Sequence, residues 1–102
     1  MRNFDVTITS DAEQDLIDIT EYLNKFSESI GTKYYNLIQN KVFSLNTMPL
    51  RYPLVRDERL ADKGLRWTFA KNYVIFFVID ENSFIVDVKR ILYSRMAYDV
   101  LL

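Results

Sequence analysis

The polar side chains best suited to chemistry lie in the last third of this sequence. Arginines can stabilise negative charge on a phosphoryl group, and a tyrosine or lysine can move a proton if its pKa is lowered. A ribonuclease without metal or histidine would need such groups as base, acid and phosphate-binding cations. The candidates near the ends of predicted strands are Arg66, Arg90, Tyr93, Arg95 and Tyr98. For each arginine alone, a solvated surface charge is the simpler explanation.

Arg90 differs from the other arginines because strand alternation places it on an apolar face. Alternation along the last strand predicts that one face carries Phe84, Val86, Val88, Arg90 and Leu92. The opposite face carries Ile85, Asp87, Lys89, Ile91 and Tyr93. A buried guanidinium needs a carboxylate or several acceptors. Two explanations stay open: an ion pair with an acid such as Asp87 or Asp80, or a position at the rim of a binding face.

The composition excludes several classes of site. The 102 residues include no cysteine and no histidine, so disulfides and zinc–thiolate sites are excluded, and the commonest general base is missing. Gly31 and Gly64 lie too far apart to form a phosphate-binding loop. We expect no metal and no cofactor.

The chain is expected to be a cytoplasmic protein with a single domain over residues 1–102. Its length fits one domain, and 49% of its residues are hydrophobic, which argues against disorder. No segment approaches the roughly 20 apolar residues that cross a bilayer. The first residues lack the layout of a signal peptide, so no membrane association is expected.

Charge is unevenly distributed along the sequence. The net charge is −1, but residues 1–50 sum to −3 and residues 51–102 to +2. Nucleic-acid-binding domains usually have a pI above about 9, whereas the pI here is about 5.3. A general nucleic-acid-coating role is therefore disfavoured, although a small basic face is compatible with these numbers.

Hydrophobic periodicity predicts a strand followed by two helices. Alternation at residues 4–8 is typical of a half-buried strand. Ser10 and Glu13 form a potential capping box, from which an apolar stripe runs to Phe26. A second helical pattern runs from Ile30 to Met48, where Pro49 should end it. The two helices should form an antiparallel hairpin.

Three strands are predicted after a loop. Residues 49–64 contain both prolines and mixed charge, and strand patterns follow at residues 65–70, 73–79 and 84–93. Residues 94–102 form a short tail that could hold a helical turn. The order predicts a two-layer α+β fold, β-α-α-β-β-β, with the hairpin on one face of a mainly antiparallel sheet. The other face would be partly open and could bind a partner.

The ordered set of segments resembles one family across essentially the whole chain. It resembles the RelE/ParE superfamily of type II toxin–antitoxin toxins, especially the ParE-like, plasmid-stabilisation branch. The matching segments are Ala12-Glu13-Gln14-Asp15-Leu16 with Ile19 and Tyr22-Leu23, residues 48–55, Asp57-Glu58-Arg59-Leu60, Gly64-Leu65-Arg66, residues 72–81, residues 88–93 and Arg95. The predicted topology is the fold that this family adopts.

The resemblance implies a growth-inhibiting toxin that a cognate antitoxin holds inactive. ParE-like members poison DNA gyrase, whereas RelE-like members cleave mRNA on the ribosome. The implied functional surface is Arg66, Arg90, Tyr93 and Arg95; in the ribonuclease alternative these arginines would hold the phosphate, with Tyr93 or Tyr98 as proton carrier. A homodimer and a toxin–antitoxin hetero-oligomer both remain open.

Three features favour a gyrase poison over a ribosome-dependent endoribonuclease. Ribonuclease members usually have an arginine just after the aromatic residue of the third strand, where this chain has Val74 after Tyr73. They often have a catalytic Tyr or His near the C-terminus, where this chain has Leu101 and Leu102. They also tend to be strongly basic, whereas this chain has a net charge of −1. One feature departs from close relatives, which tend to have Arg-Arg-Asp where this chain has Arg95-Met96-Ala97. A degenerate module that binds an antitoxin without toxicity is therefore the third alternative.

Overall fold

The structure is a computed structural model that describes the backbone of residues 3–100 and the side chains of residues 3–97. Its elements are β1 (Asp5–Ile8), α1 (Ser10–Asn24), α2 (Glu28–Ser44), η1 (Pro49–Arg51), α3 (Glu58–Asp62), β2 (Arg66–Ala70), β3 (Tyr73–Asp80), β4 (Ile85–Tyr93) and α4 (Ser94–Val100). The strands form a sheet in the order β1-β4-β3-β2. β1 runs parallel to β4, and the other neighbours are antiparallel.

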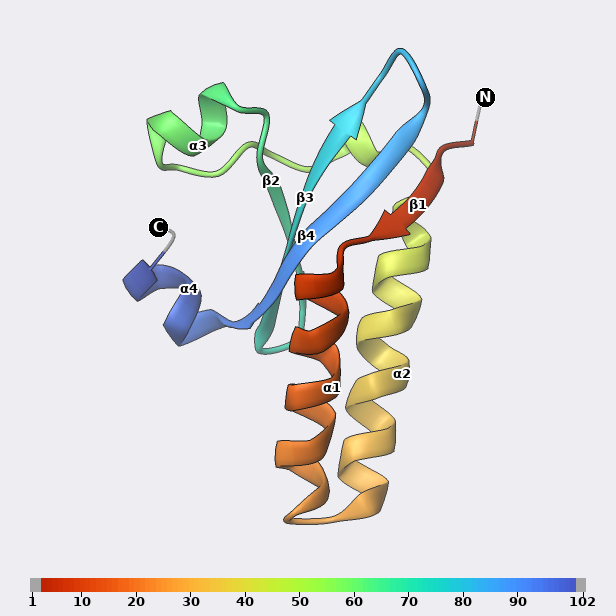
Figure 1. The fold of residues 1–102 in the computed structure, drawn as a ribbon, viewed down its shortest axis with the longest axis vertical. Coiled ribbons are helices and arrows are strands. Elements are labelled where there is room, and N and C mark those ends of the chain that lie inside the picture. Colours follow the sequence, from red (N-terminus) through yellow and green to blue (C-terminus); the bar gives the residue numbers. More distant parts are fainter. Residues whose placement is uncertain (1–2, 101–102) are drawn as a thin grey trace.

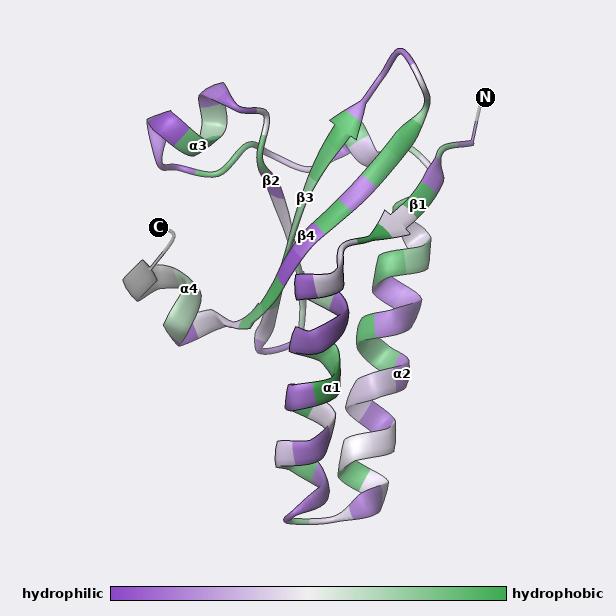
Figure 2. Cartoon of the chain, viewed as in Figure 1, coloured by the Kyte–Doolittle hydropathy of each residue, from purple (hydrophilic) through white to green (hydrophobic). Residues whose placement is uncertain are grey.

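The helices α1 and α2 form the predicted hairpin against one face of this sheet (Figure 1). Their buried side chains meet those of the strands in a helix-side core that consists of Ala12, Leu16, Ile38, Val42, Leu45, Ala70, Tyr73, Ile75, Phe77, Val86, Val88 and Ile91. Figure 2 shows the hydrophobic residues concentrated along β3, while α1 has a strongly hydrophilic outer side. The predicted α+β architecture, a helical hairpin on one face of a mainly antiparallel sheet, is confirmed.

The helix ends differ from the sequence prediction by a few residues. Thr9, rather than Ser10, caps α1, because its hydroxyl oxygen accepts a hydrogen bond from the Ala12 amide at 3.1 Å. The helix α2 ends at Ser44, before the predicted Met48. Met48 has a left-handed backbone with φ 49°, consistent with the exclusion of helical conformation before Pro49. No helix among residues 3–100 is long and apolar enough to span a membrane.

The sheet face away from the hairpin is more covered than the sequence predicts. A far-side core there consists of Val55, Trp67, Val74, Phe76 and Ala97, with Leu60, Ala61, Leu65 and Leu92 packed against it. Residues 49–64, predicted as an ordered loop, contain α3 and supply much of this cover through Val55, Leu60 and Ala61. The expected open face is therefore wrong over Trp67, Val74 and Phe76, because burying these large side chains is favourable. Phe69, nearer the end of β2, is 42% exposed.

A β-bulge in β4 changes which side chains face the helices. Phe77 pairs with Val88 and Phe76 pairs with Arg90, so Lys89 is the extra residue. After the bulge the inward positions shift by one, and Ile91 instead of Arg90 joins the helix-side core. The predicted placement of Arg90 on the face of Val86 and Val88 is therefore wrong.

Candidate functional site

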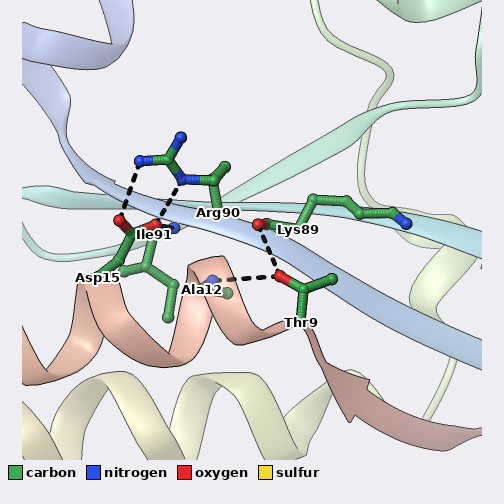
Figure 3. A network of polar contacts seen from close by, with 6 residues as sticks. All are labelled: Thr9, Ala12, Asp15, Lys89, Arg90 and Ile91. Atoms are coloured by element: carbon green, nitrogen blue, oxygen red, sulfur yellow. Dashed lines mark hydrogen bonds and ion pairs between the residues drawn. The ribbon is translucent and has the colours of Figure 1, made fainter.

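Arg90 forms an ion pair with Asp15 of α1, not with Asp87 or Asp80 as predicted. Its Nε and Nη2 donate to the two carboxylate oxygens at 2.7 and 3.0 Å, and the backbone N–H of Ile91 donates to the same carboxylate at 2.9 Å (Figure 3). The hydrogen bond to Asp15 raises the pKa of Arg90, although burial works against it. Asp87 pairs instead with Lys89.

The Asp15–Arg90 contact lies just beyond the part of β4 that pairs with β1. β1 ends at Ile8, so the next part of β4 has a free edge. The amide of Thr9 donates to the Val88 carbonyl at 3.0 Å, and the Thr9 hydroxyl donates to the Lys89 carbonyl at 2.9 Å. Asp15 then accepts from Ile91, so the start of α1 satisfies the strand edge that β1 no longer covers.

Arg66 does not lie with Arg90. It pairs across the sheet with Phe77 of the helix-side core, whereas Arg90 pairs with Phe76 of the far-side core. Cross-strand partners project to the same face, so these arginines leave the sheet on opposite faces. Arg66 also has a structural partner, because its Nη1 donates to the Tyr52 carbonyl at 2.6 Å.

Tyr93 lies in a groove between the hairpin and the end of the sheet. This groove, called here the tyrosine groove, has a volume of about 840 Å³. Tyr93 pairs with Tyr73 across the strands, and its ring lies 5.7 Å from the Tyr73 ring, which is 5.8 Å from that of Tyr34. The residues that line the groove are Asp18, Ile19, Tyr22, Leu23, Ile30, Lys33, Tyr34, Asn72, Tyr73 and Tyr93.

Arg95 lies two residues after Tyr93, in α4, and is exposed. No hydrogen bond or ion pair involves its side chain within the described residues. Ala97 is fully buried in the far-side core and helps to anchor α4. The side chain of Tyr98 lies outside the described residues, as do Leu101 and Leu102.

The arrangement suits binding better than catalysis. Among the described residues, no group of three or more acidic side chains is placed to hold a metal ion. The arginines do not surround a common point, whereas the tyrosine groove offers apolar surface with a few polar groups. This is the usual character of a protein-binding groove.

Sequence reasoning found Tyr93 but missed the other groove residues and Asp15. Tyr22 and Tyr34 looked like ordinary positions on or beside the helical stripes. Only the packing of the hairpin against the β3 start brings them to Tyr73. One sequence feature could have indicated the groove: Tyr22 lies one helical turn after Asp18 and Ile19, so the three side chains lie on the same side of the first helix.

Comparisons with known proteins give the family of this chain. The family model described as the ParE toxin of type II toxin–antitoxin systems, parDE, matches residues 6–98. The chain belongs to the ParE toxin family. It is therefore a toxin of a type II toxin–antitoxin system, and the predicted RelE/ParE identity is confirmed. A search of curated proteins gives no match.

Two solved structures resemble the fold of this ParE-family toxin. The chromosomal ParDE toxin–antitoxin system from P. aeruginosa matches with a TM-score of 0.71 and 17% identity, over 88% of this chain and 95% of that chain. The RelBE2 toxin–antitoxin complex from Mycobacterium tuberculosis matches with a TM-score of 0.67 and 19% identity, over 89% and 98%. At these identities the similarity establishes the fold.

The packing of Tyr73 in the groove predicts a loss of stability at alkaline pH. Burial, followed by the neighbouring Tyr34, Tyr93 and Tyr22, raises the pKa of Tyr73 above its ordinary 10.0. The unfolded chain then loses this proton first, so Tyr73 contributes stability below pH 10 that is lost as pH rises through its folded pKa. Denaturant unfolding should show a steeper decline above pH 10 in the wild type than in Tyr73→Phe. Equal slopes would contradict this burial.

Proposed function

We propose that this ParE-family toxin arrests growth by binding DNA gyrase and is held inactive by a cognate antitoxin protein. The family supports the toxin role, and the gyrase target follows from the ParE-like features of the sequence. The two similar solved structures come from toxin–antitoxin systems, which supports an antitoxin as the partner.

One observation carries the choice between a gyrase poison and a ribonuclease. A ribonuclease needs cations, a base and an acid around one scissile phosphate. Here Arg66 and Arg90 leave opposite faces, and each is tied to a structural partner. The sheet position that an arginine usually takes in ribonuclease members is Val74, which is fully buried. Toxicity through binding is the function that this geometry supports best.

The surface expected to act on the target is the end of β4 and the start of α4. Tyr93 is 44% exposed and Arg95 is exposed beside it. Arg90, with a side chain 46% exposed, lies on the same strand at the edge held by Asp15. The antitoxin is expected in the tyrosine groove, which opens beside Tyr93. An occupant of the groove would therefore cover part of the toxic surface.

Expression of the chain with and without its genomic neighbour tests the proposal. The chain alone should arrest growth, and the purified toxin should inhibit gyrase supercoiling without cleaving ribosome-bound mRNA. Cleavage of the mRNA would instead support the RelE-like alternative. Soluble protein without growth arrest would leave the degenerate module as the explanation.

Arg95→Ala should abolish growth arrest while the free energy of unfolding changes by less than about 0.5 kcal/mol, because the side chain removed is exposed and forms no hydrogen bond or ion pair with the side chains of residues 3–97. Arg59→Ala is the matched control, since the Arg59 side chain is 90% exposed on α3, and it should remain toxic. Growth assays and chemical denaturation measure both effects. A large loss of stability in Arg95→Ala would show that this residue is structural.

Tyr22→Ala should weaken antitoxin binding by about tenfold or more, because Tyr22 lines the groove and an aromatic side chain in a binding interface commonly contributes over 1 kcal/mol. Tyr22 is 57% exposed, so folding should be little affected. Tyr35→Ala, on α2 but away from the groove, is the matched control. Calorimetric titration with the co-encoded antitoxin measures both. Equal affinities in the two variants would place the antitoxin elsewhere.

A further inference from the structure

The strand β1 forms one outer edge of the sheet (Figure 1). On its inner side it pairs with β4, and just beyond its end the Thr9 amide donates to the Val88 carbonyl. Successive residues of a strand direct their backbone groups to opposite edges. The backbone groups of Phe4, Val6 and Ile8 therefore point away from the sheet.

The chain itself covers only the start of this outer edge. The Phe4 amide donates to the carbonyl of Asn46, just beyond α2, at 2.8 Å. Among residues 3–100, no hydrogen bond involves the outward backbone groups of Val6 and Ile8. Because an uncovered strand edge readily pairs with a strand of another chain, these two positions are available for an interface.

An apolar pocket of about 100 Å³ lies beside this edge, between β1 and the hairpin. Two large apolar side chains that line it, Phe43 and Ile8, are 57% and 39% exposed. Tyr35 and Gln39 precede Phe43 on α2 at helical steps of four, so this stripe of the helix carries no charge. The cores of protein interfaces are depleted of charge in the same way.

A second copy of this chain matches the edge, because a two-fold axis presents the same strand edge from both sides. With the axis through Thr7, Val6 of each copy lies opposite Ile8 of the other, and each of these pairs exchanges two backbone hydrogen bonds. All the outward groups are then used. A shift of two residues would instead bring in Phe4, whose amide is already bound, or Ser10, which belongs to α1.

The charges are complementary in this register. Asp5 of each copy lies opposite Thr9 of the other, and the Thr9 hydroxyl donates to the Lys89 carbonyl at 2.9 Å. The ammonium group of Lys89 lies on the face of Thr7, because it pairs with Asp87 at 2.9 Å and Asp87 accepts from the Thr7 hydroxyl. The long Lys89 side chain is therefore within reach of Asp5 of the other copy, and at the axis two uncharged threonines meet.

We propose that this chain forms a symmetric homodimer in which the β1 strands of two copies pair antiparallel about an axis through Thr7. The two four-stranded sheets then join into one continuous sheet. The helix α2 runs antiparallel to β1, because its end lies beside Phe4. Phe43 of each copy therefore packs beside Ile8 of the other. This interface goes beyond the proposed function, and it uses neither the tyrosine groove nor the end of β4.

Sedimentation equilibrium of the free full-length chain over a range of concentrations tests the proposal. The wild type should show a reversible dimer. Phe43→Lys should weaken dimerisation by about a hundredfold, because the axis removes two aromatic contacts at once and each is commonly worth about tenfold. The matched control is Phe26→Lys, since Phe26 is 69% exposed at the tip of the hairpin, and it should dimerise like the wild type.

A single cysteine tests the register. The sequence contains no cysteine, so Thr7→Cys introduces one thiol at the proposed axis. Residues that face each other there as a non-hydrogen-bonded pair have Cα atoms about 4.5 Å apart, which a disulfide spans. Thr7→Cys should therefore form a covalent dimer on mild oxidation. Ser29→Cys, exposed at the start of α2, should remain largely monomeric in a denaturing gel.

Three results would overturn the proposal. They are a wild-type chain that stays monomeric at millimolar concentration, a dimer that Phe43→Lys leaves intact, and cross-linking of Thr7→Cys that is no faster than that of Ser29→Cys. Growth arrest and gyrase inhibition are measured separately. A monomeric chain that still arrests growth would remove this interface and leave the proposed function standing.

Discussion

The carboxylate of Asp15 joins the helical hairpin to the sheet, and the rest of the structure depends on this contact. It accepts hydrogen bonds from Arg90 and from the Ile91 amide, at the point where β1 no longer covers β4. A charged acceptor on a half-buried edge contributes more than a neutral one. Without this carboxylate, the backbone amide of Ile91 would lose its hydrogen-bond acceptor, although Ile91 is a core residue that is only 1% exposed.

The bulge next to this contact sets which way the side chains at the end of β4 face. Because Lys89 is extra, Ile91 and Tyr93 face the hairpin, and Leu92 faces the far-side core. Without the bulge Tyr93 would project away from Tyr73 and the tyrosine groove would lose one wall. The same shift moves Arg90 out of the core to Asp15. The strand thus presents an aromatic groove on one side and an exposed α4 start beyond it, which are the two surfaces on which the proposed function depends.

The sequence predicted the features that depend on local periodicity. The apolar stripe from Ala12 and the continuous apolar run from Tyr73 are visible in the sequence because each depends only on the spacing of residues close together in the chain. The bulge, the Asp15–Arg90 pair and the cover over Trp67 are set by residues far apart in sequence; Asp15 and Arg90 are separated by 75 positions. Alternation assumed across Lys89 therefore misplaced Arg90, and the mixed charge of residues 57–63 concealed the apolar Leu60 that packs on the far side.

The most direct test of this account is native-state hydrogen exchange at the Ile91 amide. In the wild type this amide should exchange only through global unfolding, as slowly as the central amides of β3. In Asp15→Ala it should exchange about ten- to a hundredfold faster than those β3 amides, which is the loss of a hydrogen bond to a charged group of about 1.5–3 kcal/mol. Fast exchange at Ile91 in the wild type, or no difference in the variant, would contradict the central role of Asp15.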